Sequence, residues 1–200
     1  MVRALAHRCE PVAIANGVHA QAISGLIHWG LIPQFGLQSR GRLIVLHQAP
    51  YGSVPASLVS GGLSEADWLK ASTTLRLEHE LTHLTTKRLL GEMRLNLLDE
   101  LIADCMGMVA ALGFFSAELF GRCLGSDCRN GRWTAYTGEL SQPEANQALD
   151  LAMTRALELE QQLRAEPELL SSAQAMHRLQ WLVGQRLHQP LGPAPPPRQS

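Results

Sequence analysis

The segment from Glu78 to His83 reads Glu-His-Glu-Leu-Thr-His and carries residue types that could catalyse a reaction. His79 and His83 are four positions apart, so on a helix they lie on one face, one turn apart. Two imidazoles placed in this way can bind one Zn²⁺ through neutral ring nitrogens. Glu80 directly follows His79, and its carboxylate can reach the open metal position and take a proton from bound water. The pattern therefore predicts a zinc site with Glu80 as the general base.

A zinc site of this kind needs a third protein ligand beside an open position for water. The pattern H-E-x-x-H-x-x-G-x-x-H would supply a third His, but Thr86 and Leu89 stand in place of its Gly and last His. That pattern is excluded. Asp99 and Glu100 remain as candidates in the next predicted helix. Asp99 is expected in the first turn of that helix, where the helix dipole favours a carboxylate.

Glu100 is the predicted third ligand for a geometric reason. Asp104 lies four positions later on the same helical face. That face continues through Gly107 and Ala111, whose small side chains allow a close approach to the helix that carries His79. A ligand and the carboxylate that supports it should lie on one side of a helix. We therefore expect Asp104 to accept a hydrogen bond from a ring N–H, that of His79.

Helical patterns dominate the chain from Ser64 onward. Ser64 begins a segment that resembles a capping box, and Gly91 stands where a helix would end. Asn96 and Gly113 bracket the following apolar segment in the same way. The helices expected from these signals and from the apolar spacing cover residues 65–90, 97–112, 116–121, 141–164 and 168–188.

The N-terminal part differs in composition. Residues 1–60 are rich in Gly, Pro and β-branched residues, and the apolar run Leu43 to Leu46 suits a strand. The Pro-rich tail, residues 190–200, is expected to be extended or disordered. No repeat or clear linker divides the rest, so we predict a single domain over residues 1–189. The expected fold class is α+β, mainly α, with a small N-terminal strand region.

Charge and composition argue against two classes of partner. The 17 Lys and Arg and 18 Asp and Glu give a formal net charge of -1, which provides no field to gather nucleic acid or an anionic membrane. The apolar stretch Leu101 to Phe115 contains Asp104 and is too short to span a bilayer. The N-terminus does not have the pattern of a signal peptide. We therefore expect a cytoplasmic protein without a nucleic-acid or membrane partner.

Other reactive residues carry weaker signals. The four cysteines form no C-x-x-C pair, and free thiols are expected, although Cys123 and Cys128 could bridge in an oxidising compartment. His177, Tyr136 or a nearby Arg could stabilise an oxyanion, but no spacing rule selects one. The charged groups that flank the predicted site helices are expected to be solvated, and two tryptophans to anchor the core: Arg76, Lys87, Arg88 and Arg94; Trp68 and Trp181.

The two acidic and histidine motifs together resemble those of a known group. His79-Glu80-x-x-His83 followed by Glu100-x-x-Ala-Asp104 is similar to the gluzincin zinc metallopeptidases, which include thermolysin-like and membrane-associated CAAX-processing enzymes. The resemblance covers residues 78–104. It implies a zincin-like helical core in which His79, His83 and Glu100 bind zinc, Glu80 activates water and Asp104 orients a zinc-bound His.

The resemblance also implies a function. It suggests a metallopeptidase that cleaves peptide bonds of a peptide or protein substrate, with Leu43 to Gln48 as the strand that pairs with an extended substrate. One alternative is a non-catalytic interaction or regulatory protein in which zinc ties two helices together. A fourth protein ligand, such as His177 or a Cys, would favour that alternative. Hydrolysis of a non-peptide amide by the same residues is a third hypothesis.

Overall fold

The chain has 200 residues, and its computed structural model describes residues 48–91 and 96–196, together with Ile44, Leu46 and the backbone of two short strands. Contacts divide the chain into two compact units, residues 1–49 and 50–200. In the first unit, β1 (Ala13–Ile14) and β2 (Val18–His19) pair in antiparallel fashion, with Ala13 opposite His19 and Ile14 opposite Val18.

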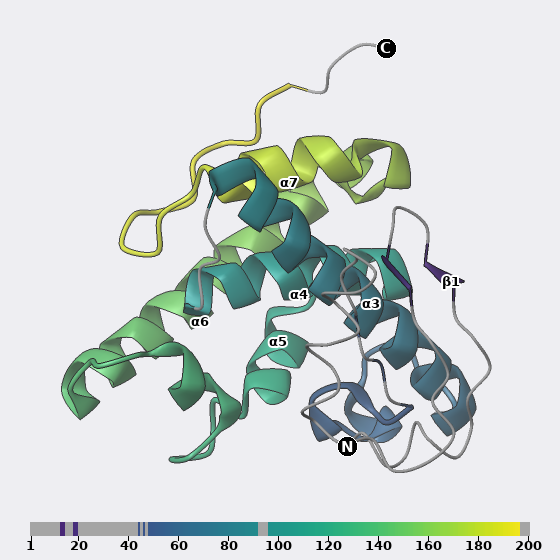
Figure 1. Ribbon diagram of the computed structural model, residues 1–200, viewed down its shortest axis with the longest axis horizontal. Helices are drawn as coiled ribbons and strands as arrows, with labels where there is room; N and C mark the ends of the chain where they lie inside the picture. The colour runs from purple at the N-terminus through teal and green to yellow at the C-terminus, as the bar shows by residue number, and fades with distance from the viewer. Residues whose placement is uncertain are drawn as a thin grey trace. The chain divides into compact units, whose positions relative to one another are not determined.

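The second unit is mainly helical, which confirms the prediction of a mainly α fold. Its α-helices are α3 (Glu65–Leu90), α4 (Leu97–Leu112), α5 (Ala117–Leu124), α6 (Gln142–Ala165) and α7 (Ala175–Val183). Short 3₁₀ helices connect or precede them: η2 (Tyr51–Ser53), η3 (Ala56–Leu58), η4 (Arg132–Tyr136), η5 (Pro167–Leu170) and η6 (Ser172–Gln174). Figure 1 shows α4 in the interior of this unit, beside α3 and with α6 and α7 nearby.

Helices α3 and α4 begin and end where the sequence predicts. Ser64 precedes α3 and its side chain accepts a hydrogen bond from the Asp67 backbone N–H. The Asn96 side chain accepts from two backbone N–H groups at the start of α4. Gly91 and Gly113 follow α3 and α4 with φ of 79° and 80°, a left-handed conformation that glycine adopts without steric cost. These caps fix the positions of both helices that carry the predicted site.

The predicted helix over residues 168–188 is wrong in extent. The chain forms η5 and η6 first, and only α7 is α-helical. Between the two 3₁₀ helices, Ser171 is extended, with φ of -60° and ψ of 144°. The buried Arg178 guanidinium donates to the backbone carbonyls of Leu169 and Ser171. The side chain therefore satisfies carbonyls that an uninterrupted helix would have paired itself.

Helix α4 forms the centre of the core. Its residues 101–109 are all buried, and it packs against α3, α6 and α7. Trp68 is 1% exposed and its ring N–H donates to the Val54 carbonyl at 2.7 Å. Trp181 is also buried and donates to the Gly192 carbonyl at 3.0 Å. Both tryptophans are the core anchors that the sequence predicts.

Gly107 of α4 lies against the backbone of α3 and leaves no room for a side chain. A Cβ atom added there would lie 2.7 Å from the Leu75 carbonyl oxygen of α3. Gly107→Ala is therefore expected to lower the free energy of unfolding by up to about 2 kcal/mol, because overpacking outweighs the gain in helix propensity. Denaturant unfolding checks this, and a more stable variant would contradict the close packing.

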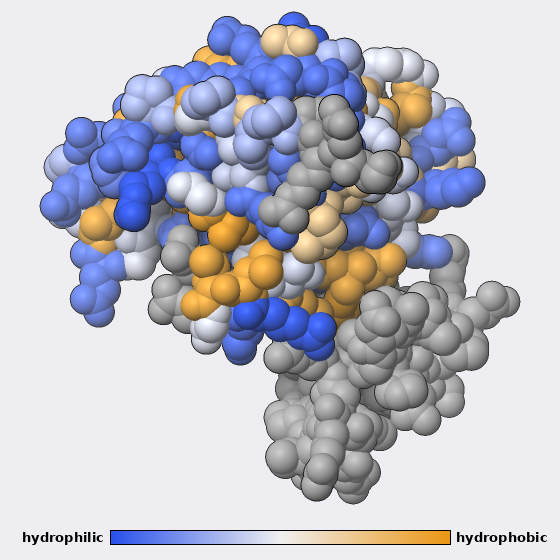
Figure 2. Space-filling model, turned by 90° about the horizontal axis from the view of Figure 1, so that it is seen from above, coloured by the Kyte–Doolittle hydropathy of each residue, from blue (hydrophilic) through white to orange (hydrophobic). Residues whose placement is uncertain are grey.

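The outer faces of the helices are polar. Figure 2 shows hydrophilic residues over most of the described surface on one side, with hydrophobic residues gathered in a smaller area. Among the described residues, none of the helices combines the length and the apolar character that a membrane span needs. The amphipathic pattern is that of helices packed around a protein core.

Cysteines and chain ends complete the description. Cys105, Cys123 and Cys128 are free thiols, as predicted, and the first two are buried. Residues 190–196 have no helix or strand, and the Leu191 backbone N–H donates to Glu158 at 2.9 Å. The predicted strand Leu43 to Leu46 falls largely outside the described residues; Ile44 and Leu46 are described, and neither is in a strand.

Candidate metal centre

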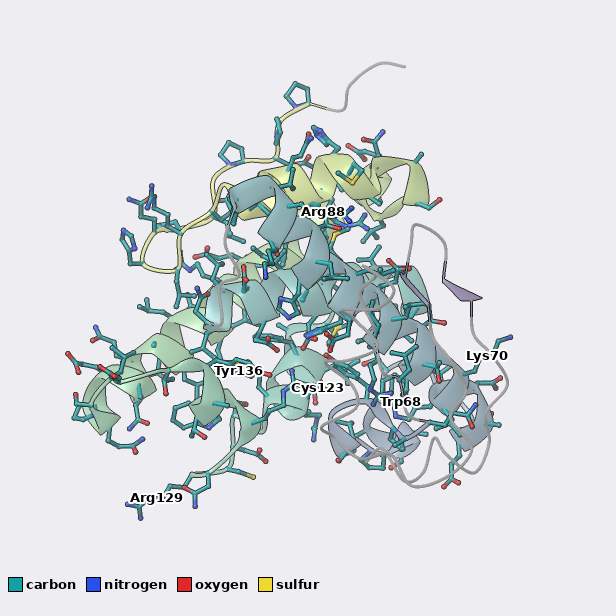
Figure 3. The ribbon with its side chains drawn as sticks, in the orientation of Figure 1. Trp68, Lys70, Arg88, Cys123, Arg129 and Tyr136 are labelled. Atoms are coloured by element: carbon teal, nitrogen blue, oxygen red, sulfur yellow. The ribbon has the colours of Figure 1, made fainter. Side chains whose placement is uncertain are left out.

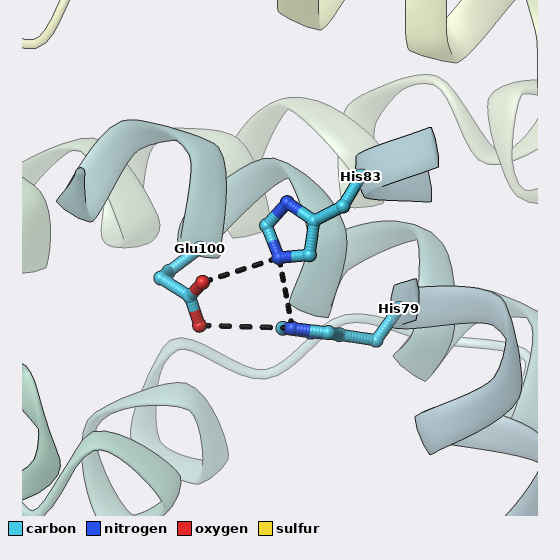
Figure 4. A group of neighbouring side chains, drawn as sticks. All are labelled: His79, His83 and Glu100. Carbon is cyan, nitrogen blue, oxygen red and sulfur yellow. Dashed lines mark hydrogen bonds and ion pairs between the residues drawn. The ribbon is translucent and has the colours of Figure 1, made fainter. Parts of the chain in front are cut away.

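The three predicted ligands lie together between α3 and α4 (Figure 4). His79 and His83 project from successive turns of α3, and Glu100 from the first turn of α4. The two Nε2 atoms are 3.0 Å apart. His83 Nε2 lies 3.1 Å from Glu100 Oε1, and His79 Nε2 lies 3.7 Å from Glu100 Oε2. All three side chains are buried, and this group could bind a metal ion.

The separations fit a small tetrahedral ion. With metal–ligand bonds of about 2.0–2.1 Å, neighbouring ligand atoms of a tetrahedron are about 3.3 Å apart. The two Nε2 atoms are 3.0 Å apart, and His83 Nε2 lies 3.1 Å from Glu100 Oε1, both close to that value. The 3.7 Å contact of His79 Nε2 is to the other carboxylate oxygen, Oε2. The three side chains therefore need only small adjustments to surround one ion.

Hydrogen bonding prepares His79 to be a ligand through Nε2. Its Nδ1 lies 2.7 Å from Asp104 Oδ1, on the side of the ring away from the other two ligands. The Tyr51 hydroxyl lies 2.9 Å from the same nitrogen and donates to Asp104. An ionised carboxylate can only accept, so Nδ1 carries the proton and Nε2 keeps its lone pair. Asp104 occupies the supporting position that the sequence predicts.

The pKa shifts of Asp104 and Tyr51 agree with their roles as acceptor and donor. Burial would raise the pKa of Asp104, but the hydrogen bond and charge of His79 and the charge of Arg132 outweigh it, so this pKa is lowered. Burial, and next the negative charge of Asp104, raises the pKa of Tyr51 well above its ordinary value. Asp104 is therefore an ionised acceptor and Tyr51 a protonated donor.

Acceptor atoms converge on the centre of the group. A metal-binding His79 is neutral, with its proton on Nδ1 and only a lone pair at Nε2, and both oxygens of a Glu100 carboxylate can only accept. Without a metal, burial would lower the pKa of His79, but the hydrogen bond and charge of Asp104 outweigh it, so this pKa is raised and a cation would take the place of the Nε2 proton. A hydrogen on His83 Nε2 can satisfy one of these acceptors, either His79 Nε2 or Glu100 Oε1. Glu100 and Asp104 are also only 2% and 0% exposed, so their charges are removed from water. A divalent cation suits this convergence of lone pairs and buried negative charge.

Sequence reasoning missed the residues that surround this group. Tyr51 comes from η2, and Arg132 from η4 donates to Glu100 Oε2 at 2.9 Å. Asp99 also contributes, since its Oδ2 lies 3.9 Å from His83 Nδ1, in addition to the first-turn position that was expected. Spacing gives no signal for Tyr51 or Arg132, because both belong to short segments without helical periodicity. Asp99 likewise has no spacing in the sequence that would pair it with His83.

The other candidates fall in different places. Tyr136, a possible oxyanion donor, lies beside the centre, where burial and next the charge of Glu100 raise its pKa. His177 Nε2 is instead 2.8 Å from the Pro195 carbonyl oxygen on the side of α7. Lys87 and Arg88 are exposed at the end of α3, and Arg94 is outside the described residues. Figure 3 shows Tyr136 in the central part of the unit and Arg88 near the far end of its helix.

Glu80 and Arg76 lie on the same helix as the two histidines. Both are half-buried, and the negative charge of Glu80 acts on His79 and on Arg76. Glu80 is not a member of the ligand group. Glu80 therefore follows a ligand in the chain but is not itself a ligand, so its carboxylate stays available to act as a general base.

The fold and the site define a mainly helical protein with a candidate metal centre of two His and one Glu between adjacent helices. Residues 31–189 match the family of unknown function DUF7005, and the chain belongs to that family. No curated protein and no solved structure matches the chain.

Proposed function

We propose that this protein is a zinc-dependent hydrolase and that it cleaves peptide bonds. The observation that carries the proposal is the convergence of His79 Nε2, His83 Nε2 and Glu100 on one point, with Glu80 next to His79 in the sequence of α3. Three protein ligands with an open position are typical of catalytic zinc, whereas structural zinc usually has four. The similarity of residues 78–104 to gluzincin motifs supports peptide hydrolysis over other hydrolytic reactions.

The donor set suits zinc among the divalent metals. Two imidazole nitrogens and one carboxylate oxygen form a donor set of intermediate hardness, and the separations suit tetrahedral geometry. Zinc, when bound there, would lower the pKa of a water molecule and polarise the scissile carbonyl group. Thiolate-rich sites select other metals or clusters, and no described cysteine joins this group.

The protein's own residues have distinct tasks in this reaction. Glu80 accepts a proton from the attacking water and passes it to the leaving amine. Asp104 and Tyr51 hold the His79 ring so that Nε2 faces the ion. The ligands come from well-packed helices, which keeps the reacting groups in fixed positions.

A non-catalytic zinc-stabilised protein is the competing function. It requires a fourth protein ligand, and the part of the chain that the structure describes supplies three. The candidates for that role, His177 or a cysteine, are not in the group: His177 contacts the Pro195 carbonyl, and no described cysteine joins the three ligands. These placements favour the open, catalytic arrangement.

The purified protein is expected to contain about one zinc ion per chain. We also expect it to cleave members of a mixed peptide library, detected by mass spectrometry, and to stop when a chelator removes the metal. Re-addition of zinc should restore cleavage. Absence of zinc would refute the metal site, whereas zinc with four protein ligands by X-ray absorption and no cleavage would establish the non-catalytic function.

A further inference from the structure

Arg132 contacts the ligand carboxylate from outside the two site helices. Its Nη2 donates to Glu100 Oε2 at 2.9 Å, while Glu100 Oε1 lies 3.1 Å from His83 Nε2. The two oxygens of one carboxylate therefore have different partners. Oε1 lies nearest to His83 Nε2, whereas Oε2 accepts from Arg132 and lies 3.7 Å from His79 Nε2.

Two aromatic rings hold the guanidinium group in that position. Its central carbon lies 5.7 Å from the ring centroid of Tyr51 and 5.7 Å from that of Tyr136. Cations at such distances are attracted to the ring faces. An arginine guanidinium stays charged in proteins, so Arg132 is a charged donor whose orientation is set by Tyr51 and Tyr136.

A carboxylate ligand can bind a metal ion through one oxygen or through both. An oxygen that accepts a charge-assisted hydrogen bond has less electron density to offer a metal. If both oxygens of Glu100 bound beside the two histidines and a water, the metal would be five-coordinate instead of four-coordinate. The partner of Oε2 therefore decides the coordination number of the centre.

We propose that Arg132 is a positioning residue that makes Glu100 a one-oxygen ligand and thereby keeps the metal four-coordinate, with one position left for water. The inference rests on the proposed zinc site. It assigns to η4 a role in the geometry of a centre whose ligands all come from α3 and α4. Tyr51 would serve both halves of the centre, through Asp104 on the His79 side and through Arg132 on the Glu100 side.

Cobalt substitution tests this inference, because four-coordinate Co²⁺ absorbs visible light several-fold more strongly than five-coordinate Co²⁺. We expect the full-length protein loaded with Co²⁺ to show the strong absorption. In Arg132→Gln, Glu100 should bind through both oxygens and the absorption per bound cobalt should fall several-fold. Arg132→Met, which fills the space between the tyrosine rings without donating, should behave in the same way. Arg132→Lys should recover part of the intensity.

Arg129→Gln is the matched control. Arg129 is exposed and lies at the tip of the segment between α5 and η4, away from Tyr136 (Figure 3), so the same change of charge should leave the spectrum unaltered. Circular dichroism verifies that each variant is folded. A wild-type spectrum in Arg132→Gln or Arg132→Met would overturn the positioning role and leave the zinc site intact. Failure of the wild-type protein to bind Co²⁺ or Zn²⁺ would overturn both.

Discussion

Glu80→Gln is expected to keep one zinc per chain and to slow peptide hydrolysis by about 10²–10⁴-fold. The amide has nearly the same size as the carboxylate but cannot accept the proton of the attacking water. Glu80 is half-buried and is not a member of the ligand group, so the loss of its charge should leave His79, His83 and Glu100 in place. Steady-state cleavage of a peptide substrate, with zinc measured by atomic absorption on the same sample, checks both parts.

Glu78→Gln provides the matched control for this variant. Glu78 is also half-buried on α3, two residues before Glu80, and lies outside the ligand group. The change of charge is identical, so the control should retain most of the activity. Equal activities in the two variants would remove Glu80 from the mechanism, whereas simultaneous loss of zinc from Glu80→Gln would show that the side chain holds the site together.

His79→Ala is expected to abolish zinc binding. The substitution removes one of three ligands and leaves Asp104 without the ring that it orients. Ligand binding to the folded state stabilises a protein by about 4 kcal/mol when the free ligand is at 1,000 times its dissociation constant. The increase in melting temperature that zinc gives to the metal-free wild-type protein should therefore be absent in the variant, which differential scanning calorimetry can measure.

Two further variants should give a smaller loss of zinc affinity and no loss. Asp104→Asn keeps all three ligands but weakens the acceptor of the His79 ring, so its zinc affinity should fall by about 10–100-fold rather than vanish. His177→Ala removes a histidine that contacts the Pro195 carbonyl and should retain wild-type affinity. Full zinc retention by His79→Ala would refute the assignment of the ligands.

The long helices and the three ligands could be predicted because their signals are local. Ser64 and Gly91 mark the ends of α3, and the i, i+4 spacing of His79 and His83 requires one helical face. Glu100 follows from the same spacing argument applied to Asp104. These features depend on neighbours within one or two turns, which a sequence displays directly.

The surroundings of the centre could not be predicted, because they depend on contacts between distant segments. Tyr51 reaches Asp104 across 53 positions, and Arg132 reaches Glu100 across 32 positions. The extent of α7 has the same cause, since Arg178 binds carbonyls of a preceding turn that has no helical signal of its own. A lone Tyr before a helix, or a lone Arg in a Gly-containing segment, has no spacing that reveals its partner.

The three ligands come from α3 and α4, whereas Tyr51 and Arg132 come from other segments, and this difference has a consequence for the order of folding. All three ligands belong to one helical hairpin, α3 and α4, joined by the short connection between Gly91 and Asn96. Contacts that are near in sequence form early, because little loop entropy is lost. We therefore expect the hairpin to gather its ligands first and to capture metal while Tyr51 and Arg132 are still unfolded. Refolding with zinc present should then be faster than refolding of the metal-free chain.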